Sequence, residues 1–164
     1  VYDHIPLLEA PELTPESFKP AGWTSLYDAI GTAIQRTGER LERLPEDERP
    51  NKVMVAIITD GQENTSSEYN LSQVNNMIDV QRNTYSWHIL FIGSTLQAQS
   101  QRRVLSSVQS SHSMSYGSAQ NAATMYRTLS SGTKHFRNSK SGADHASQLE
   151  ATGGSFYNPD EQTS

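Results

Sequence analysis

The chain has 164 residues, enough for one domain with a hydrophobic core of its own. It contains no cysteine, which excludes disulfides, thiol catalysis and thiolate metal sites. A formal net charge of −5 without a basic block argues against nucleic-acid binding, and no apolar run approaches the roughly 20 residues that a membrane span needs.

The lack of cysteine and of a visible signal peptide is typical of a reducing compartment. We therefore expect a cytoplasmic or virion-associated protein rather than a secreted one. Because the chain begins with Val1 and not with Met, we also expect a further segment to precede it.

The first helix is expected over residues 25–44, after a proline-rich, acidic loop over residues 10–20. Ser25 and Asp28 have the spacing of a capping box, with Asp in place of the usual Glu, so we expect Asp28 to cap its own helix. The apolar residues of this segment recur at helical spacing and comprise Leu26, Ala29, Ile30, Ala33, Ile34, Leu41 and Leu44.

The most distinctive stretch is residues 52–60, KVMVAIITD, which is followed by Gly61. It is apolar or β-branched except at Lys52 and Asp60, and such a run is typical of a strand buried on both faces of a parallel sheet. Ligands in such sheets bind beyond the carboxyl ends of the strands, where Asp60 lies. A helix start that carries hydroxyls, followed by a strand that ends in Asp, indicates part of a cation site.

The rest of the chain alternates helices with strands. We expect helices over residues 71–82, 96–108 and 119–136, a strand over 87–92 and a weak strand over 112–116. Residues 139–164 are rich in Ser, Gly, Asn and Asp without a core pattern, which favours a polar tail or linker. The alternation predicts an α/β fold with a mostly parallel sheet and flanking helices.

Two segments together, GWTSLYDAIGTAI at residues 22–34 and KVMVAIITDGQENTS at residues 52–66, resemble a von Willebrand factor A (vWA) domain of the bacterial and phage type. The resemblance implies a Rossmann-like vWA sandwich over residues 1–138, with a metal-ion-dependent adhesion site at the top of the sheet. Thr24 and Asp60 match two metal ligands of that family. The implied ion is Mg²⁺, or Mn²⁺ or Ca²⁺, and the implied partner is a protein that offers a carboxylate, with Trp23, Glu63 and Asn64 on the rim.

The chain departs from the family pattern at its first strand. That strand should be followed by an Asp-x-Ser-x-Ser loop, and no such motif occurs in this sequence. We therefore expect a fold that is N-terminally incomplete, with the missing strand in an upstream segment or a complementing chain. With Thr24 and Asp60 alone, Mg²⁺ binding by this chain should be weak or absent.

Simpler interpretations of the same residues remain open. Thr24 suits a helix N-cap, and Asp60 with Gly61 suits a turn after a strand. Glu63 and Asn64 fit the polarity of any loop, and Trp23 could pack under that loop. The histidines are not expected to bind metal: His88 falls within a strand and should be packed, and His112, His135 and His145 lack ligand spacing.

Three classes of function follow. The first is a metal-dependent protein-binding module within a larger assembly, which is not an enzyme. The second is a structural assembly subunit with a vestigial or split metal site. The third is a Mg²⁺-dependent phosphotransfer enzyme, since haloacid dehalogenase-type enzymes also have a strand that ends in Asp-Gly. Their second Asp should lie two residues from the first, where this chain has Ile58 and Gln62.

Overall fold

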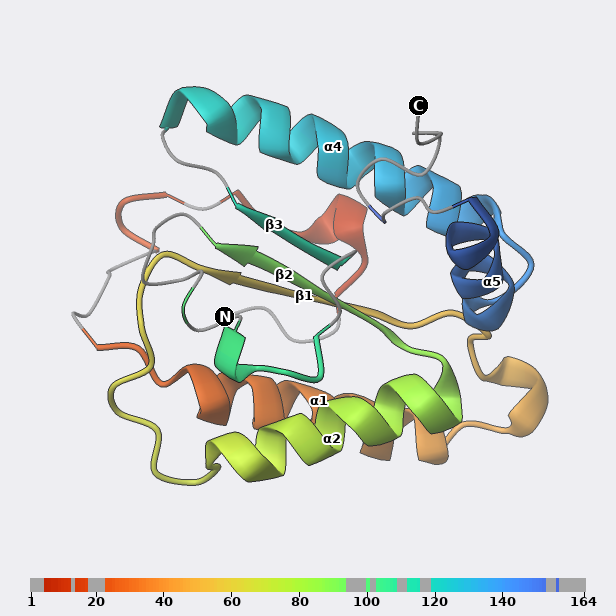
Figure 1. The fold of residues 1–164 in the computed structure, drawn as a ribbon, viewed down its shortest axis with the longest axis horizontal. Helices are drawn as coiled ribbons and strands as arrows, with labels where there is room; N and C mark the ends of the chain where they lie inside the picture. Colours follow the sequence, from red (N-terminus) through yellow and green to blue (C-terminus); the bar gives the residue numbers. More distant parts are fainter. Residues whose placement is uncertain are drawn as a thin grey trace.

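The computed structural model describes residues 5–12, 14–17, 23–93, 100, 103–108, 112–115, 119–152 and 156. The described chain is α/β, with a three-stranded sheet in the order β1-β2-β3 between layers of helices (Figure 1). The strands are β1 (Met54–Thr59), β2 (His88–Gly93) and β3 (Ser113–Ser115). Both strand pairs are parallel, as the alternation of helices and strands predicts.

Helices cover the two faces of the sheet (Figure 1). On one face lie α1 (Leu26–Glu42) and α2 (Leu71–Tyr85), and on the other lies α4 (Ala119–Asn138) with α5 (Gly142–Thr152) near its end. Two short 3₁₀ turns, Leu7–Glu9 and Glu46–Glu48, complete the described elements. Within the described part of the chain, no helix is both long enough and apolar enough to cross a bilayer.

The two layers bury separate apolar clusters because side chains alternate along β2. Ile89 and Phe91 join the cluster beneath α1 and α2, whereas Leu90 and Ile92 join the one beneath α4 and α5. All six residues of β2 are buried, as expected for a central strand of a parallel sheet.

The strand β1 differs from its prediction. It lies at the edge of the described sheet, and while Ile57 is buried, Ala56 is exposed and Ile58 is 50% exposed. The expectation that this strand is buried on both faces is therefore wrong. The physical reason is that the cluster beneath α4 takes in Leu90 and Ile92 of β2 but only Met54 of β1, so Ala56 and Ile58 on the same face stay exposed.

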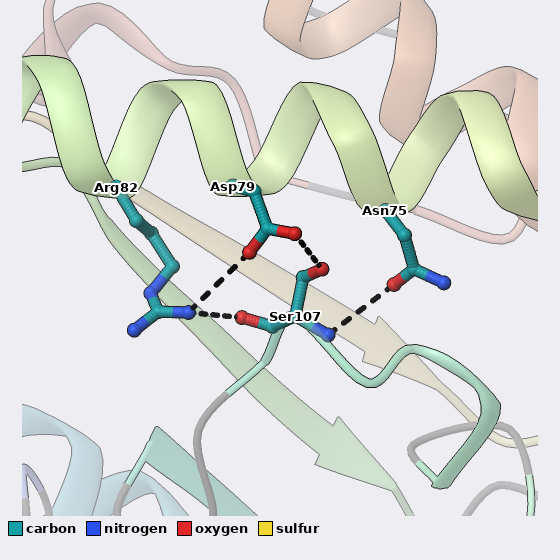
Figure 2. Close-up of polar contacts among 4 residues, drawn as sticks. All are labelled: Asn75, Asp79, Arg82 and Ser107. Atoms are coloured by element: carbon teal, nitrogen blue, oxygen red, sulfur yellow. Dashed lines mark hydrogen bonds and ion pairs between the residues drawn. The ribbon is translucent and has the colours of Figure 1, made fainter.

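A polar cluster attaches residues 103–108 to α2 (Figure 2). Ser107 donates its hydroxyl to Asp79 at 2.8 Å and its backbone N–H to Asn75 at 3.3 Å. Arg82 donates to the Ser107 carbonyl and lies 4.0 Å from the Asp79 carboxylate. Leu105 and Val108 are buried nearby. The predicted end of the helix over 96–108 is wrong, because residues 105–108 form a turn closed by a hydrogen bond from the Val108 N–H to the Leu105 carbonyl, and much of the rest of that helix lies outside the described residues.

The segment after residue 138 is not simply a tail, which corrects the prediction for residues 139–164. Residues 142–152 form α5, which buries His145 and Leu149. Phe156 is fully buried in the cluster beneath α4. The low apolar content of this segment hid a few well-placed core residues, and the rest of it lies outside the described residues.

Candidate functional site

The carboxyl end of β1 meets the amino end of α1. A Cβ atom added to Gly61 would lie 3.5 Å from the Thr24 hydroxyl oxygen, so Thr24 stands against the Asp60–Gly61 turn. We call Thr24, Asp60 and Gly61 the Thr24–Asp60 corner. The fold thus brings together the two residues that the sequence selects as metal ligands.

Asn64 holds Thr24 in this position through two hydrogen bonds. The Thr24 backbone N–H donates to the Asn64 side-chain oxygen at 2.9 Å, and the Asn64 N–H donates to the Thr24 carbonyl at 3.1 Å. Next to them the hydroxyls of Ser25 and Thr65 lie 2.8 Å apart. These bonds join the loop after β1 to the start of α1, so Asn64 fixes the position of Thr24.

Glu63 binds the amino end of α1. Its carboxylate accepts from the Tyr27 N–H at 3.0 Å, from the Thr65 N–H at 2.9 Å, and from the Ser66 N–H and hydroxyl, both at 2.7 Å. Partial burial acts to raise the pKa of Glu63, but these hydrogen bonds outweigh it and hold that pKa below its ordinary value. A carboxylate here satisfies helix N–H groups that lack a partner within the helix.

Asp28 does not cap its own helix, which corrects the capping-box prediction. Ser25 is the N-cap of α1 and makes no side-chain capping bond. The Asp28 carboxylate instead accepts the backbone N–H groups of Ser67, Glu68 and Tyr69 at 2.8–2.9 Å. The bond from Ser67 is the largest cause of a lowered pKa at Asp28. The capping alternative for Thr24 is also wrong, because Ser25 occupies that position.

The corner faces solvent. Asp60 is exposed, Thr24 is partly exposed, and the Trp23 side chain is 76% exposed, so Trp23 does not pack under the loop. The Thr59 hydroxyl accepts from the Gly61 N–H at 3.3 Å and stabilises the turn that carries Asp60. Thr24 and Asp60 therefore both lie at the solvent-accessible surface.

The donor chemistry of the corner fits a hard cation in part. A hydroxyl and a carboxylate are oxygen ligands of the kind that Mg²⁺ prefers, and no soft ligand competes. Among the residues that the structure describes, however, no group of three or more His, Cys, Asp or Glu is placed to hold a metal. The Glu63 carboxylate and the Asn64 side-chain oxygen are already hydrogen-bonded within the chain. The corner alone thus offers two protein ligands.

A second constellation was not anticipated from the sequence. His88 from β2, His112 before β3 and His145 from α5 gather in the interior, with His88 Nδ1 and His112 Nε2 3.0 Å apart. The His88 and His145 ring centres lie 4.9 Å apart, beside Phe136 and Phe156. We call these three residues the histidine cluster. Neither ring nitrogen of His145 has a hydrogen-bond partner within the described chain.

Burial is the largest cause of lowered pKa values throughout the histidine cluster. It lowers the pKa of His112 to about 3 and that of His145 to about 4, and it also lowers the pKa of His88. All three rings are therefore neutral at pH 7. The prediction that His88 is packed is confirmed. No sequence spacing signals the cluster, because its members come from three separate parts of the fold.

Comparison with known proteins leaves the function to be argued from these residues alone. No protein-family model, no curated protein and no solved structure matches this chain.

Proposed function

We propose that this chain is a protein-binding module of the vWA type, which holds a divalent cation at the Thr24–Asp60 corner. The single observation that carries the proposal is the Thr24 hydroxyl against the Asp60–Gly61 turn, 3.5 Å from the position of a Gly61 Cβ. The parallel α/β arrangement supports it, because ligands of such sheets bind at the carboxyl ends of strands.

The chemistry of the corner favours recognition over catalysis. A Mg²⁺ ion held by one carboxylate and one hydroxyl keeps positive charge and open coordination positions. A carboxylate from a partner protein then completes the coordination. The exposed Trp23 side chain lies next to Thr24 and offers the partner an aromatic contact. Glu63 and Asn64 lie in the loop after β1, which is bonded to Thr24 through Asn64.

A structural assembly subunit without metal is the second candidate. The exposed edge of β1 favours it, because an open apolar strand needs a partner whether or not the corner binds a cation. This candidate predicts that Asp60→Ala leaves assembly unchanged. Phosphotransfer at Asp60 has less support, since Ile58 and Gln62 stand where a second carboxylate belongs.

Manganese titration tests the proposal directly, because paramagnetic Mn²⁺ broadens the NMR signals of nearby amides. We expect weak binding, on the order of millimolar, with the signals of Thr24 and Gly61 broadened first. Mg²⁺ in excess should restore them. Asp60→Ala should abolish the selective broadening, because it removes the only carboxylate of the corner.

The matched control is Asp47→Ala, which removes an exposed carboxylate from the 3₁₀ turn at Glu46–Glu48. It should leave the broadening at Thr24 intact. Broadening that begins at Glu46–Glu48, or that survives Asp60→Ala, would rule out the corner as the cation site. Binding in the micromolar range would contradict a site with two protein ligands. If a metal-loaded corner recognises carboxylates, sodium acetate should further shift the Thr24 signal in the presence of Mg²⁺.

A further inference from the structure

Among the residues that the structure describes, the outer edge of β1 pairs with no second strand. The Val53 carbonyl accepts from the His88 N–H at 2.9 Å, and β1 pairs with β2 over six residues from Met54 to Thr59. Backbone groups of alternate residues in a parallel strand point to opposite sides. The backbone N–H and C=O groups that point to β2 are therefore those of Val53, Val55 and Ile57. The backbone groups that point to the outer edge are those of Met54, Ala56 and Ile58. Within the described chain, β1 pairs with no second strand.

This edge lacks the features that normally protect one. Natural edge strands are short, interrupted by bulges or proline, or charged. The strand MVAIIT contains no charge and no proline, and its register with β2 is unbroken. The side chains of Met54, Ala56 and Ile58 share one face of the sheet, where Ala56 is exposed and Ile58 is 50% exposed. The outward backbone groups can form hydrogen bonds with a further β-strand, and the exposed side chains can pack against that strand.

The outer edge of β1 can pair with the same edge of a second copy that runs in the opposite direction. Residues 54 and 58 lie at equal distances from Ala56, and so do Lys52 and Asp60. In an antiparallel pair centred on Ala56, the small alanine side chains meet at the axis and Met54 faces Ile58 on each side. The positive end of each strand then lies beside the negative end of the other. Because the Lys52 ammonium group donates to the carbonyls of Arg137 and Ser139, this attraction acts between strand ends rather than as a direct ion pair.

We propose that β1 binds β1 of a second copy of this chain, antiparallel and around a two-fold axis at Ala56. The two three-stranded sheets then join into one continuous sheet. The outward N–H and C=O groups of Met54, Ala56 and Ile58 all gain partners in this register. This interface requires no metal, so it stands or falls independently of the Thr24–Asp60 corner.

Light scattering coupled to size-exclusion chromatography measures the predicted assembly. The purified chain should have twice its mass of 18.2 kDa and dissociate on dilution. Ala56→Pro should give a monomer, because it removes an outward N–H and leaves the β1–β2 hydrogen bonds intact. Ile58→Lys should do the same by placing two charges in the interface. Val80→Lys is the matched control, since Val80 on α2 is 42% exposed and lies outside the proposed interface.

Cysteine crosslinking tests the register, and the natural chain has no cysteine to interfere. In the proposed pair the two Ala56 Cα atoms lie about 5.5 Å apart, within disulfide range. Ala56→Cys should therefore form a covalent dimer under mild oxidation. Ile58→Cys alone should not, because its two copies are offset by four residues, about 14 Å. A mixture of the Met54→Cys and Ile58→Cys chains should crosslink.

A monomeric wild-type chain at high micromolar concentration would overturn the proposal. So would a dimer that persists in both Ala56→Pro and Ile58→Lys while circular dichroism shows that they are folded. Equal crosslinking of Ala56→Cys and Ile58→Cys would exclude this register. If a strand from another polypeptide pairs with this edge instead, light scattering should find a complex that contains one copy of this chain and a different protein. That result would also overturn the proposed dimer.

Discussion

At the scale of single residues, the histidine cluster holds the buried side-chain nitrogens that lack hydrogen-bond partners among the described residues. His145 is 2% exposed, and its two ring nitrogens lack partners in the described chain. A buried polar group without a hydrogen bond costs about 1–3 kcal/mol. Besides burial, the nearby His88, His135 and Lys52 lower the pKa of His145, and only Asp144 raises it. We therefore expect protonation of this cluster to be the first cause of lost stability as the pH falls.

We predict that the free energy of unfolding decreases as the pH falls below about 6.5. The unfolded chain then binds protons at ordinary histidine pKa values, whereas folded His145 and His112 stay neutral down to pH values of about 4 and about 3. Stability is thus fully present above pH 6.5 and is lost progressively below it, by up to about 1.4 kcal/mol per pH unit for each histidine. Urea unfolding at pH 7, 6 and 5 measures this slope.

In the variant His145→Leu, the number of protons taken up on unfolding in acid should fall by about one, so the free energy of unfolding should depend less steeply on pH. The free energy of unfolding at pH 7 should rise. Leucine has a similar volume and carries no buried unpaired nitrogen. Val80→Leu is the control, because Val80 on α2 is 42% exposed and lies outside the histidine cluster, and it should leave the acid slope unchanged. A slope unchanged in His145→Leu would show that the acid sensitivity arises elsewhere.

Asp28 holds the second half of the loop after β1. Its carboxylate accepts the backbone N–H groups of three successive loop residues, at 2.8–2.9 Å. Asp28→Ala should speed hydrogen exchange at Ser67, Glu68 and Tyr69 and increase cleavage of the loop by proteases. Asp47→Ala should change neither. Unchanged exchange at all three amides in Asp28→Ala would contradict the importance of these bonds.

At the scale of secondary-structure elements, the packing of α4 against Phe156 determines how the C-terminal segment is held. A Cβ atom on Gly132 would lie 2.1 Å from the Phe156 carbonyl oxygen, so only glycine permits this approach. The same logic applies on the other face, where a Cβ on Gly31 would lie 2.5 Å from the Tyr69 ring. Each glycine lets a separate segment pack directly on a helix.

We predict that Gly132→Ala and Phe156→Ala both loosen the C-terminal segment. Phe156→Ala should lower the free energy of unfolding by about 3–5 kcal/mol, because it empties a fully buried ring site. Gly132→Ala should be destabilising although alanine favours helices. The matched control is Gly38→Ala on α1, where a Cβ meets nothing within 4 Å, and it should stabilise by about 0.5–1 kcal/mol. Thermal unfolding of the three variants measures these effects. Equal effects of Gly132→Ala and Gly38→Ala would contradict the close packing of Gly132 against the Phe156 carbonyl.

The element predictions from sequence succeed where periodicity is strong. α1, α2, α4 and the strands at residues 54–59 and 88–93 lie within a few residues of their predicted positions. α5 was missed because its buried residues, His145 and Leu149, are too few to produce a clear apolar stripe. The weak strand over 112–116 is confirmed as β3, and its position depends on pairing with β2.

At the scale of the whole molecule, the sheet is unequally covered. β2 is enclosed by helices on both faces, whereas β1 ends the described sheet with an open edge and exposes Ala56 and Ile58 on one face. The Thr24–Asp60 corner lies at the carboxyl end of this same strand. Both proposed interactions, of a cation with the corner and of a second copy with the edge, therefore use β1.

The sequence by itself determined the α/β class of the fold, the parallel direction of its strands and the choice of Thr24 and Asp60 as candidates. These follow from local periodicity and from motifs within short segments, which depend on nearby residues. Only the tertiary structure decided the role of Asp28, the burial of Phe156, the gathering of His88, His112 and His145, and the exposure of β1. Each of these depends on residues from different elements meeting in space, and side-chain spacing along the chain does not encode such meetings.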